Sequence, residues 1–404
     1  MDPTDHPAIG EQTVIRIVAP FGFYGWGNIG DEATLSGFAR LLALSGVRAR
    51  VAVASHNPAH TARVEPTFSY FDASSRDPRR WLAKLRATAH AIVGGTPIMD
   101  IEGDWPLRDL APLVRSIDRW KVPLAFIGVG TESLRLDKSR RIVADEIAPR
   151  AAHWSVRSDR DRRRLTDYGV PAQLITVAAD MAWLIEAATP EFGRDHLQRL
   201  GVDPGKSLIG VNLVNENLVF DRQPQMVDAL ATALDELAAT MDARVIFLAN
   251  EVREDATFDK AAATKVIARM KRSDRAVLVP NRYLAPRQMM SIIGCCALAI
   301  SMRYHFCLFS ALQGVPFIAI ERSDKVADLC WDIDWPARVA PPRFDAAEIV
   351  AHGKRLRQAT SALTGRLHSS VQKMRGRALR NVAALNALAG HPPIAISQEP
   401  LVIP

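Results

Sequence analysis

The chain has 404 residues, which predicts about two domains, and 48% of them are hydrophobic, enough to build substantial apolar cores. Its formal net charge of +7 favours anionic partners, such as a phosphorylated substrate, an anionic membrane surface or nucleic acid. The sequence contains neither a run of about 18 apolar residues nor a signal peptide, which excludes a transmembrane helix and indicates a cytoplasmic protein.

The first elements alternate between strand and helix. Residues 13–20 form an apolar, β-branched run that predicts a buried strand, and residues 35–42 carry apolar side chains at helical spacing. Between them lies a glycine-rich loop, residues 21–32, in which Asp31 is expected to cap the helix. With a second strand at 50–54, this order makes a strand–helix–strand unit whose loop lies where open α/β sheets bind ligands.

The same loop contains a possible dinucleotide fingerprint. Gly25-Trp26-Gly27-Asn28-Ile29-Gly30 matches the G-x-G-x-x-G pattern. A dinucleotide site also needs an acidic residue about twenty positions beyond the glycines. Because the second strand ends instead in Ala54-Ser55-His56, the sequence disfavours NAD binding.

The rest of the first half continues the alternation. Residues 55–80 are polar and contain three prolines, which predicts a loop region. We predict further strands at 91–97, 122–129, 154–159 and 174–179, and helices at 81–90, 108–120, 139–151 and 161–168. Glycine or charged loops follow these strands, so we expect the loops to share one edge of a parallel sheet.

A second alternating set begins after a boundary near residues 187–204, which divides the chain into domains 1–187 and 188–404. We predict strands at 207–213, 244–249, 276–279, 295–300 and 315–320, and helices at 225–241, 255–269, 284–293, 306–312, 325–330 and across most of 342–390. The predicted fold class is therefore α/β, with mostly parallel sheets in two Rossmann-like domains.

The four cysteines lie in this second half: Cys295, Cys296, Cys307 and Cys330. Their spacing matches no set of metal ligands. We therefore expect reduced thiols packed as small apolar groups, and no metal site.

One cation and one titratable ring follow the predicted strand at 295–300. Arg303 carries a permanent charge on a planar donor fork, and His305 can carry a proton near neutral pH. This pair is suited to binding an anion beside a proton donor.

Four short segments follow one another along the chain: Asn28-Ile29-Gly30-Asp31-Glu32, Ile92-Val93-Gly94-Gly95, Ser155-Val156-Arg157-Ser158, and Met302-Arg303-Tyr304-His305 with the later Gly314-Val315-Pro316 and Lys325-Val326. In order and spacing they resemble the N-x-G-D, glycine-run, V-R-D and R-x-H signatures of the polysaccharide pyruvyltransferase family. Thr96 departs from a third glycine that is common there, and Ser158 replaces the aspartate.

The resemblance implies two Rossmann-like domains facing a central cleft, as in GT-B glycosyltransferases. It implies transfer of pyruvate from phosphoenolpyruvate to two hydroxyls of a sugar, giving a cyclic ketal. Phosphoenolpyruvate is then a co-substrate, and no cofactor is expected. The acceptor would be a sugar of a glycan or glycolipid precursor, lipid-linked acceptors included, bound on the side of residues 1–187, with the donor on the side of residues 188–404.

Roles for individual residues follow from this resemblance. His305 is the expected general acid, with Arg303 beside it at the catalytic centre. The expected donor-binding residues are Arg303, Arg157, Lys325, Gly94 and Gly95. The expected acceptor or cleft-loop residues are Asn28, Gly30, Asp31, Glu32 and Asp100, and the base for the sugar hydroxyl would be Asp31, Glu32 or Asp100.

Other interpretations of these residues stay open. His305 could be a structural histidine, Arg303 a surface ion-pair partner and Asn28 a turn residue. Arg157 could belong with the neighbouring arginines on a solvated helix face. Tyr24 and Trp26 could stack on a sugar ring or form part of the core. A run of basic residues is expected on a solvated face, with attraction to the inner membrane leaflet as the alternative: Lys373, Arg375, Arg377 and Arg380.

Three classes of function remain to be separated besides the pyruvyltransferase. One is a nucleotide-sugar-dependent glycosyltransferase of the same fold, and another is a non-catalytic binding homologue. Binding to nucleic acid is disfavoured, because the aromatic residues lack the interleaved basic pattern of single-strand binders. The sequence leaves the oligomeric state open.

Overall fold

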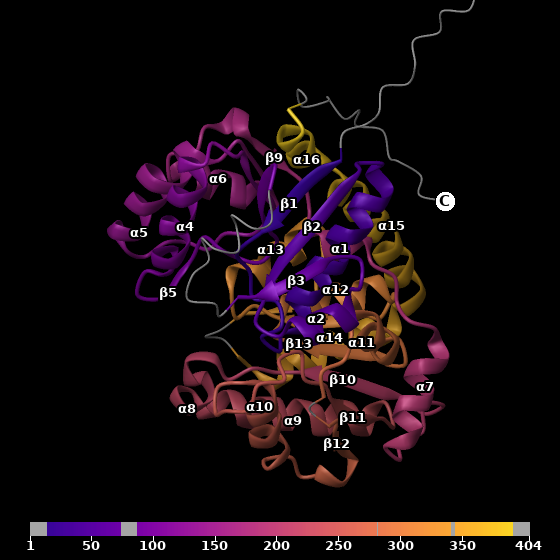
Figure 1. Ribbon diagram of the computed structural model, residues 1–404. Helices are drawn as coiled ribbons and strands as arrows, with labels where there is room; N and C mark the ends of the chain where they lie inside the picture. The colour runs from indigo at the N-terminus through magenta and orange to yellow at the C-terminus, as the bar shows by residue number, and fades with distance from the viewer. Residues whose placement is uncertain (1–13, 74–86, 281, 341–343, 391–404) are drawn as a thin grey trace, which may run out of the picture.

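Two parallel sheets, one in each half of the chain, organise the fold (Figure 1). The structure, a computed structural model, describes residues 14–73, 87–280, 282–340 and 344–390. The first sheet has the strand order β3-β2-β1-β4-β7-β8-β9, and all its neighbouring strands are parallel. Its strands are β1 (Ile15–Ala19), β2 (Ala49–Ser55), β3 (Ser69–Asp72), β4 (Ala89–Val93), β7 (Leu124–Val129), β8 (His153–Val156) and β9 (Ile175–Val177).

The second sheet has the order β12-β11-β10-β13-β14-β15 and is also parallel throughout. Its strands are β10 (Leu208–Asn212), β11 (Arg244–Phe247), β12 (Ala276–Leu278), β13 (Leu298–Ser301), β14 (Phe317–Ile320) and β15 (Arg338–Val339). Strands β10, β13 and β14 are buried at every residue. Such continuous apolar runs are typical of parallel strands covered by helices on both faces.

Helices connect successive strands in both halves. In the first half they are α1 (Ile29–Ser45), α2 (Pro58–Val64), α4 (Leu107–Arg119), α5 (Asp137–Arg141) and α6 (Asp159–Asp167), and α7 (Pro190–Arg199) leads into the second half. In the second half they are α8 (Val219–Arg222), α9 (Pro224–Thr240), α10 (Asp259–Ile267), α11 (Pro286–Ile293), α12 (Tyr304–Leu312), α13 (Asp324–Asp332) and α14 (Ala346–Gln358). Two Rossmann-like domains with parallel sheets were predicted, and the structure confirms them.

The strand order reverses at one point in each sheet, between β1 and β4 and between β10 and β13. In open α/β sheets, ligands bind beyond the carboxyl ends of the strands at such a reversal. The loops that leave these ends are residues 20–28 and 94–97 in the first domain, and residues 213–218 and 302–303 in the second. The fold therefore directs attention to these four loops.

The C-terminal helices return to the first domain (Figure 1). Helix α15 (Thr360–Leu379) packs against a short 3-10 helix, Met181–Leu184, and α16 (Val382–Leu388) packs on β7 and β8. Between them, the fully buried Asn381 donates to the Ala179 carbonyl at 2.9 Å and accepts from the Ser155 hydroxyl at 2.7 Å. Asn381 thus bonds the segment between α15 and α16 to β8 and to the residues that follow β9 in the first sheet.

The expectation of a solvated basic face is wrong for two of its four residues. Arg375 donates to the carbonyls of Trp183 and Ile185, and Arg377 donates to that of Ala178 and pairs with Asp332. These guanidiniums face the junction between the domains, which lowers the positive charge that this helix can offer to a membrane surface. Within the described residues, no helix is long and apolar enough to cross a membrane.

Several local predictions differ from the structure. The expected loop over residues 55–80 contains α2 and β3. Both elements are too short to show a period in the sequence, and Pro66 lies between them, so they were not predicted. The expected helix at 81–90 is wrong at its end, where Ala89 and His90 belong to β4; residues 81–86 lie outside the described ranges. The hairpin of β5 (Asp100–Glu102) and β6 (Trp105–Pro106) was not expected.

We expect Asn381→Ala to lower the free energy of unfolding by about 1–3 kcal/mol, because the buried Ser155 hydroxyl and Ala179 carbonyl lose their partner. Urea unfolding followed by circular dichroism measures the change. Lys373→Ala, at an exposed position of α15, is the control and should stay within about 0.5 kcal/mol of the wild type. Equal stability of the two variants would contradict a structural role for this bond.

Candidate active site

The first turns of α1 and α12 meet between the two domains. A Cβ atom added to Gly30 in α1 would overlap the His305 ring, which projects from the start of α12. Glycine is therefore required at position 30 for the two helices to approach this closely. The positive ends of both helix dipoles then converge on one place, which favours a bound anion.

Asn28 fixes the start of α1 and also joins the domains. It is the N-cap of α1, and its Oδ1 accepts from Gly30 N and from the Asn250 side chain, both at 2.9 Å. The Asn250 carbonyl in turn accepts from Ile29 N. The expectation that Asp31 caps the helix is wrong: Asn28 takes that place, and the carboxylate of Asp31 is left for other contacts.

A buried chain of charges holds His305. Asp180, fully buried, lies 3.3 Å from His305 Nε2 and 3.0 Å from Arg157 Nε. Burial opposes ionisation of Asp180, but Arg157 and His305 lower its pKa to about 2. The carboxylate is therefore ionised at neutral pH, and its negative charge orients the imidazole ring. Thr34 Oγ1 lies 3.4 Å from the same Nε2.

Arg157 is buried, so the expectation of a solvated face does not hold for it. Its Nε donates to the Gly128 carbonyl at 3.1 Å, and its guanidinium carbon lies 5.5 Å from the centre of the Tyr304 ring. Nη2 is also buried, and it has no hydrogen-bond partner among the described residues. Buried donors normally have a hydrogen-bond partner, so an unpaired guanidinium N–H indicates a place where an anion can bind.

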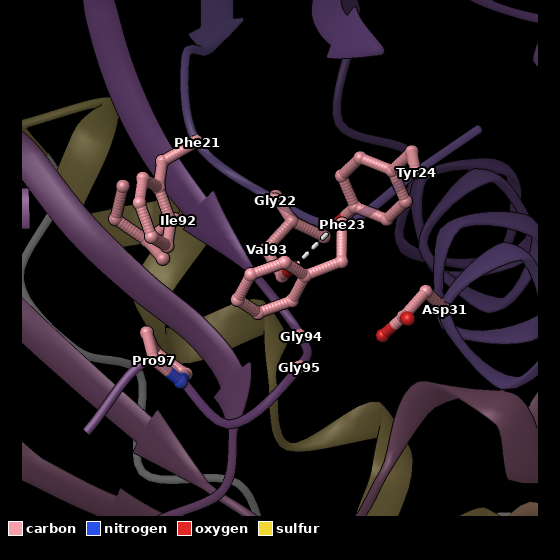
Figure 2. A pocket seen from close by; sticks show the side chains of 10 residues that line it. All are labelled: Phe21, Gly22, Phe23, Tyr24, Asp31, Ile92, Val93, Gly94, Gly95 and Pro97. Carbon is pink, nitrogen blue, oxygen red and sulfur yellow. Dashed lines mark hydrogen bonds between the residues drawn. The ribbon is translucent and has the colours of Figure 1, made fainter. Parts of the chain in front are cut away.

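Asp31 lines a hollow at the strand reversal of the first sheet. The hollow is small, about 10 Å³ or room for about one water molecule, and it is lined by residues that include the loop after β1, Gly94 and Gly95. Figure 2 shows the Asp31 carboxylate pointing into it from α1, opposite Phe23. Burial raises the pKa of Asp31 to about 6, although the charges of His305 and Lys325 act against the shift.

The other two candidates for the base are engaged elsewhere. Glu32 is buried, accepts from Gly25 N at 2.7 Å and accepts from the Tyr283 hydroxyl at 2.9 Å. Asp100 is buried in β5 and accepts from the backbone N–H groups of Arg135 and Leu136, both at 2.8 Å. Both carboxylates hold loops together, which leaves Asp31 as the carboxylate of the three that faces the hollow.

Arg303 is paired with two carboxylates. Its Nη2 lies 2.6 Å from Asp259 Oδ1, and its Nη1 lies 3.0 Å from Glu216 Oε1. The second oxygen of Glu216 lies 2.8 Å from Arg322 Nη2. Although burial opposes the charge of Arg303, Asp259 and Glu216 raise its pKa, so it stays cationic.

Lys325 stands at the edge of this group. Its Nζ lies 3.8 Å from Glu132 of the first domain, and about a third of its side chain is exposed. Burial opposes ionisation of Glu216, but Arg303, Arg322 and Lys325 lower its pKa to about 2. Glu216 thus occupies, as an anion, the space between cations that a ligand anion would need.

The glycines after β4 have two different tasks. A Cβ on Gly94 would overlap Thr34, so this glycine lets the strand end pack on α1. A Cβ on Gly95 would meet only Phe23, at 3.9 Å, so Gly95 lies at the open side of the hollow. Both have positive φ, 58° and 66°, a conformation that side chains rarely adopt.

The two departures from the family pattern are compatible with the site. Ser158 is the N-cap of α6 and accepts from Asp161 N at 3.1 Å, which is also what an aspartate would do there. Thr96, which follows Gly95 in the chain, is buried. Within the described part of the chain, no cluster of three or more histidine, cysteine or acidic side chains could hold a metal ion.

Six residues that the site uses were missed from sequence: Thr34, Asp180, Glu216, Asn250, Asp259 and Arg322. Asp180 directly follows the predicted strand 174–179. Its position after the strand 174–179 was the available signal, because it places the carboxylate at the same sheet edge as Arg157. Glu216 and Asp259 lie in segments without a motif, and only the fold brings them to Arg303.

We expect Gly30→Ala to displace the His305 ring from Asp180, because the new methyl group takes its space. A crystal structure of the variant measures the displacement, and thermal unfolding should show a lower midpoint. Gly376→Ala is the matched control: a Cβ there meets nothing within 4 Å, and the change should stabilise α15 by about 0.5–1 kcal/mol. An undisplaced ring in Gly30→Ala would contradict the steric argument.

Comparison of the whole fold with solved structures shows similarity to nucleotide-sugar enzymes. A UDP-GlcNAc 2-epimerase from Neisseria meningitidis bound to UDP-GlcNAc is 9% identical, with a TM-score of 0.60 over 92% of this chain and 99% of that chain. Anabaena Alr3699/HepE in complex with UDP-glucose is 13% identical, with a TM-score of 0.60 over 93% and 98%. The UDP-GlcNAc 2-epimerase from Methanocaldococcus jannaschii is 10% identical, with a TM-score of 0.58 over 85% and 92%.

At these identities the likeness concerns the fold alone, and it confirms the GT-B-like arrangement of the two domains. No match was found among curated proteins. A family model described as polysaccharide pyruvyl transferase matches residues 28–324, which include Asn28, Gly30, Arg157, Arg303 and His305. The chain therefore belongs to the polysaccharide pyruvyl transferase family.

Proposed function

We propose that the protein transfers pyruvate from phosphoenolpyruvate to two hydroxyls of a sugar in a glycan or glycolipid precursor, forming a cyclic ketal. The observation that carries the proposal is the unused buried donor of Arg157 beside His305, at the meeting point of two helix N-termini. Fixed cations and free N–H groups are what a substrate with both a carboxylate and a phosphate requires.

The donor would be held by cations from both domains. Arg157 offers its free Nη2 on the first-domain side. On the second-domain side, Arg303 and Arg322 share Glu216, so a donor anion would replace that carboxylate. Lys325, less tightly paired, can follow the anion. Such an exchange keeps every buried cation paired before and after binding, which limits the cost of desolvation.

His305 is the proposed acid and Asp31 the proposed base. His305 delivers a proton to the methylene carbon of the enol, and the first sugar hydroxyl bonds to the adjacent carbon and loses its proton to Asp31. The second hydroxyl then bonds to the same carbon. The bond between this carbon and the phosphate oxygen breaks, and inorganic phosphate leaves. One C–H bond and two C–O bonds form, while the C=C π bond, one C–O bond and two O–H bonds break. The methyl group keeps the proton from His305, phosphate takes the proton of the second hydroxyl, and the proton held by Asp31 returns through solvent to His305, which closes the cycle.

The test is to incubate the purified protein with phosphoenolpyruvate and a panel of glycosides and to measure phosphate release. We expect release that depends on one acceptor, with a cyclic ketal in the product by NMR. UDP-GlcNAc and UDP-glucose serve as comparators, because two of the structural neighbours named above were solved with these ligands. Turnover of a UDP-sugar, without phosphate release or phosphoenolpyruvate binding, would replace the proposal with a nucleotide-sugar-dependent activity.

We expect His305→Ala to cut turnover by about 10²–10⁴, the usual contribution of a general acid, while the melting temperature stays close to that of the wild type. Phosphate release and thermal unfolding measure the two quantities. His352→Ala is the matched control, because His352 lies in α14 beside Glu348, on the second domain. An unfolded His305→Ala protein would mean that the ring is structural.

The role of Asp31 as the base can be tested through the pH dependence of turnover. Asp31 must be ionised to accept a proton, so turnover should rise with pH through about 6, and Asp31→Asn should lose most of the activity together with this rise. The fold holds the Asp31 proton more tightly than the unfolded chain, whose pKa is near 3.8. The stability contributed by Asp31 is thus present below that value and lost as pH rises through about 6.

Asp31→Asn should therefore gain stability over the wild type at pH 8 and not at pH 4. Thermal unfolding at the two pH values provides a measurement that is independent of activity. The same stability difference at both pH values would contradict the raised pKa.

We expect Glu216→Gln to bind phosphoenolpyruvate more tightly, because a neutral amide competes less well for Arg303 and Arg322 than a carboxylate does. Isothermal titration calorimetry measures the dissociation constant, which should fall by about tenfold for each 1.4 kcal/mol of lost competition. Glu348→Gln, on α14, is the control and should leave the constant unchanged. Weaker binding in Glu216→Gln would indicate that Glu216 positions the arginines instead of competing with the donor.

A further inference from the structure

Three aromatic rings cluster beside the hollow. Phe23 and Trp26 come from the loop after β1, and Trp105 comes from β6. The rings of Phe23 and Trp26 are nearly parallel, with centres 5.8 Å apart. The centre of the Trp105 ring lies 5.6 Å from that of Phe23 and 6.4 Å from that of Trp26. We call Phe23, Trp26 and Trp105 the aromatic wall.

The aromatic wall is not part of the core. Each of the three rings is half-buried, and none belongs to either of the two apolar cores formed by the described residues. By contrast, Tyr24 from the same loop is buried, and its hydroxyl donates to the Val93 carbonyl. Each Å² of apolar surface left in water loses about 25 cal/mol of the free energy that burial would contribute. Large apolar rings that stay partly exposed therefore indicate a function other than core packing.

Neighbouring groups hold the wall in place from behind. The Trp26 ring stacks on His56 with a centre-to-centre distance of 4.5 Å, and the guanidinium carbon of Arg253 lies 5.2 Å from the Trp26 centre. The faces of Trp26 are thus largely used by the protein. Phe23 stacks on Trp26 and meets Phe21 edge-on, with ring centres 5.8 Å apart in both pairs, so among the described residues its remaining face and Trp105 are what the wall leaves for a ligand.

The wall adjoins the groups of the proposed reaction. Phe23 lines the hollow together with Asp31 and Gly95, and Figure 2 shows its ring across the hollow from the Asp31 carboxylate, with Gly94 and Gly95 between the two in this view. A ligand that lies against Phe23 and Trp105 can therefore place a hydroxyl group near Asp31. The C–H bonds on one face of a pyranose carry a slight positive charge that is attracted to the negative face of an aromatic ring.

We propose that the aromatic wall is the subsite for the acceptor sugar: one face of a pyranose packs on Phe23 and Trp105, and its hydroxyl pair is directed at Asp31. The assignment of the sugar as acceptor rests on the proposed pyruvyl transfer, whereas the binding of a pyranose by the wall does not. The ligand class is an uncharged pyranoside with a continuous face of C–H groups.

Binding is tested first, without the reaction. Saturation-transfer-difference NMR is recorded for the full-length protein with methyl β-D-galactopyranoside, methyl β-D-glucopyranoside, methyl α-D-mannopyranoside and methyl N-acetyl-β-D-glucosaminide. We expect at least one of them to bind through the C–H protons of one face, and Trp105→Ala or Phe23→Ala to weaken that binding about tenfold, while Trp105→Phe retains most of it. Trp331→Ala removes a ring on α13 that is 57% exposed and should change nothing.

The outcomes separate the subsite from the reaction. In the phosphate-release assay, Trp105→Ala should raise the acceptor KM about tenfold and leave phosphoenolpyruvate binding unchanged. If the wild type turns over phosphoenolpyruvate but Trp105→Ala keeps the acceptor KM, the subsite is wrong and the reaction stands. If a pyranoside binds through the wall but phosphoenolpyruvate is not used, the reaction is wrong and the subsite stands. Binding of none of the four pyranosides, or equal binding by the wild type and both alanine variants, overturns the subsite.

Discussion

The contact between Gly30 and the His305 ring is the constraint on which the site depends. Two helices from different domains can bring their first turns together only because position 30 has no side chain. Asn28 and Asn250 then bond across the same junction, and Asp180 fixes the other edge of the ring. Every group with a proposed part in the chemistry is placed relative to this junction, so the site exists only when both domains are folded and in contact.

Charge balance is the second constraint, and it follows from the first. The junction buries several cations, and a buried charge is costly unless it is paired. Asp180 neutralises Arg157, while Asp259 and Glu216 neutralise Arg303. The pairs differ in kind: Asp180 and Asp259 are almost completely buried, whereas about a third of the Glu216 side chain is exposed. Glu216, the carboxylate that we propose is exchanged for the donor, is therefore the most exposed of the three.

The sequence predicted the parallel domains because long apolar strands alternate with helices of clear period. It did not predict β3, β15 or the β5–β6 hairpin, since two to four residues show no period, and local pairing decides them. Gly30, Arg157, Arg303 and His305 were found from short motifs. Asp180 and Glu216 were not, because what makes them important is distance in space to residues far away in the chain. Among Asp31, Glu32 and Asp100, only packing could distinguish the carboxylate in the hollow from two that hold loops.

The path of the C-terminal segment limits how the two domains can move. The chain passes between them once near residues 185–189 and again at the end of α15, and Arg375 bonds these two passages together through the carbonyls of Trp183 and Ile185. Any opening of the junction between the domains would therefore have to bend the chain at these two bonded passages. Such an opening would also break the bond of Tyr283 to Glu32 and that of Asn250 to Asn28, which join the two domains.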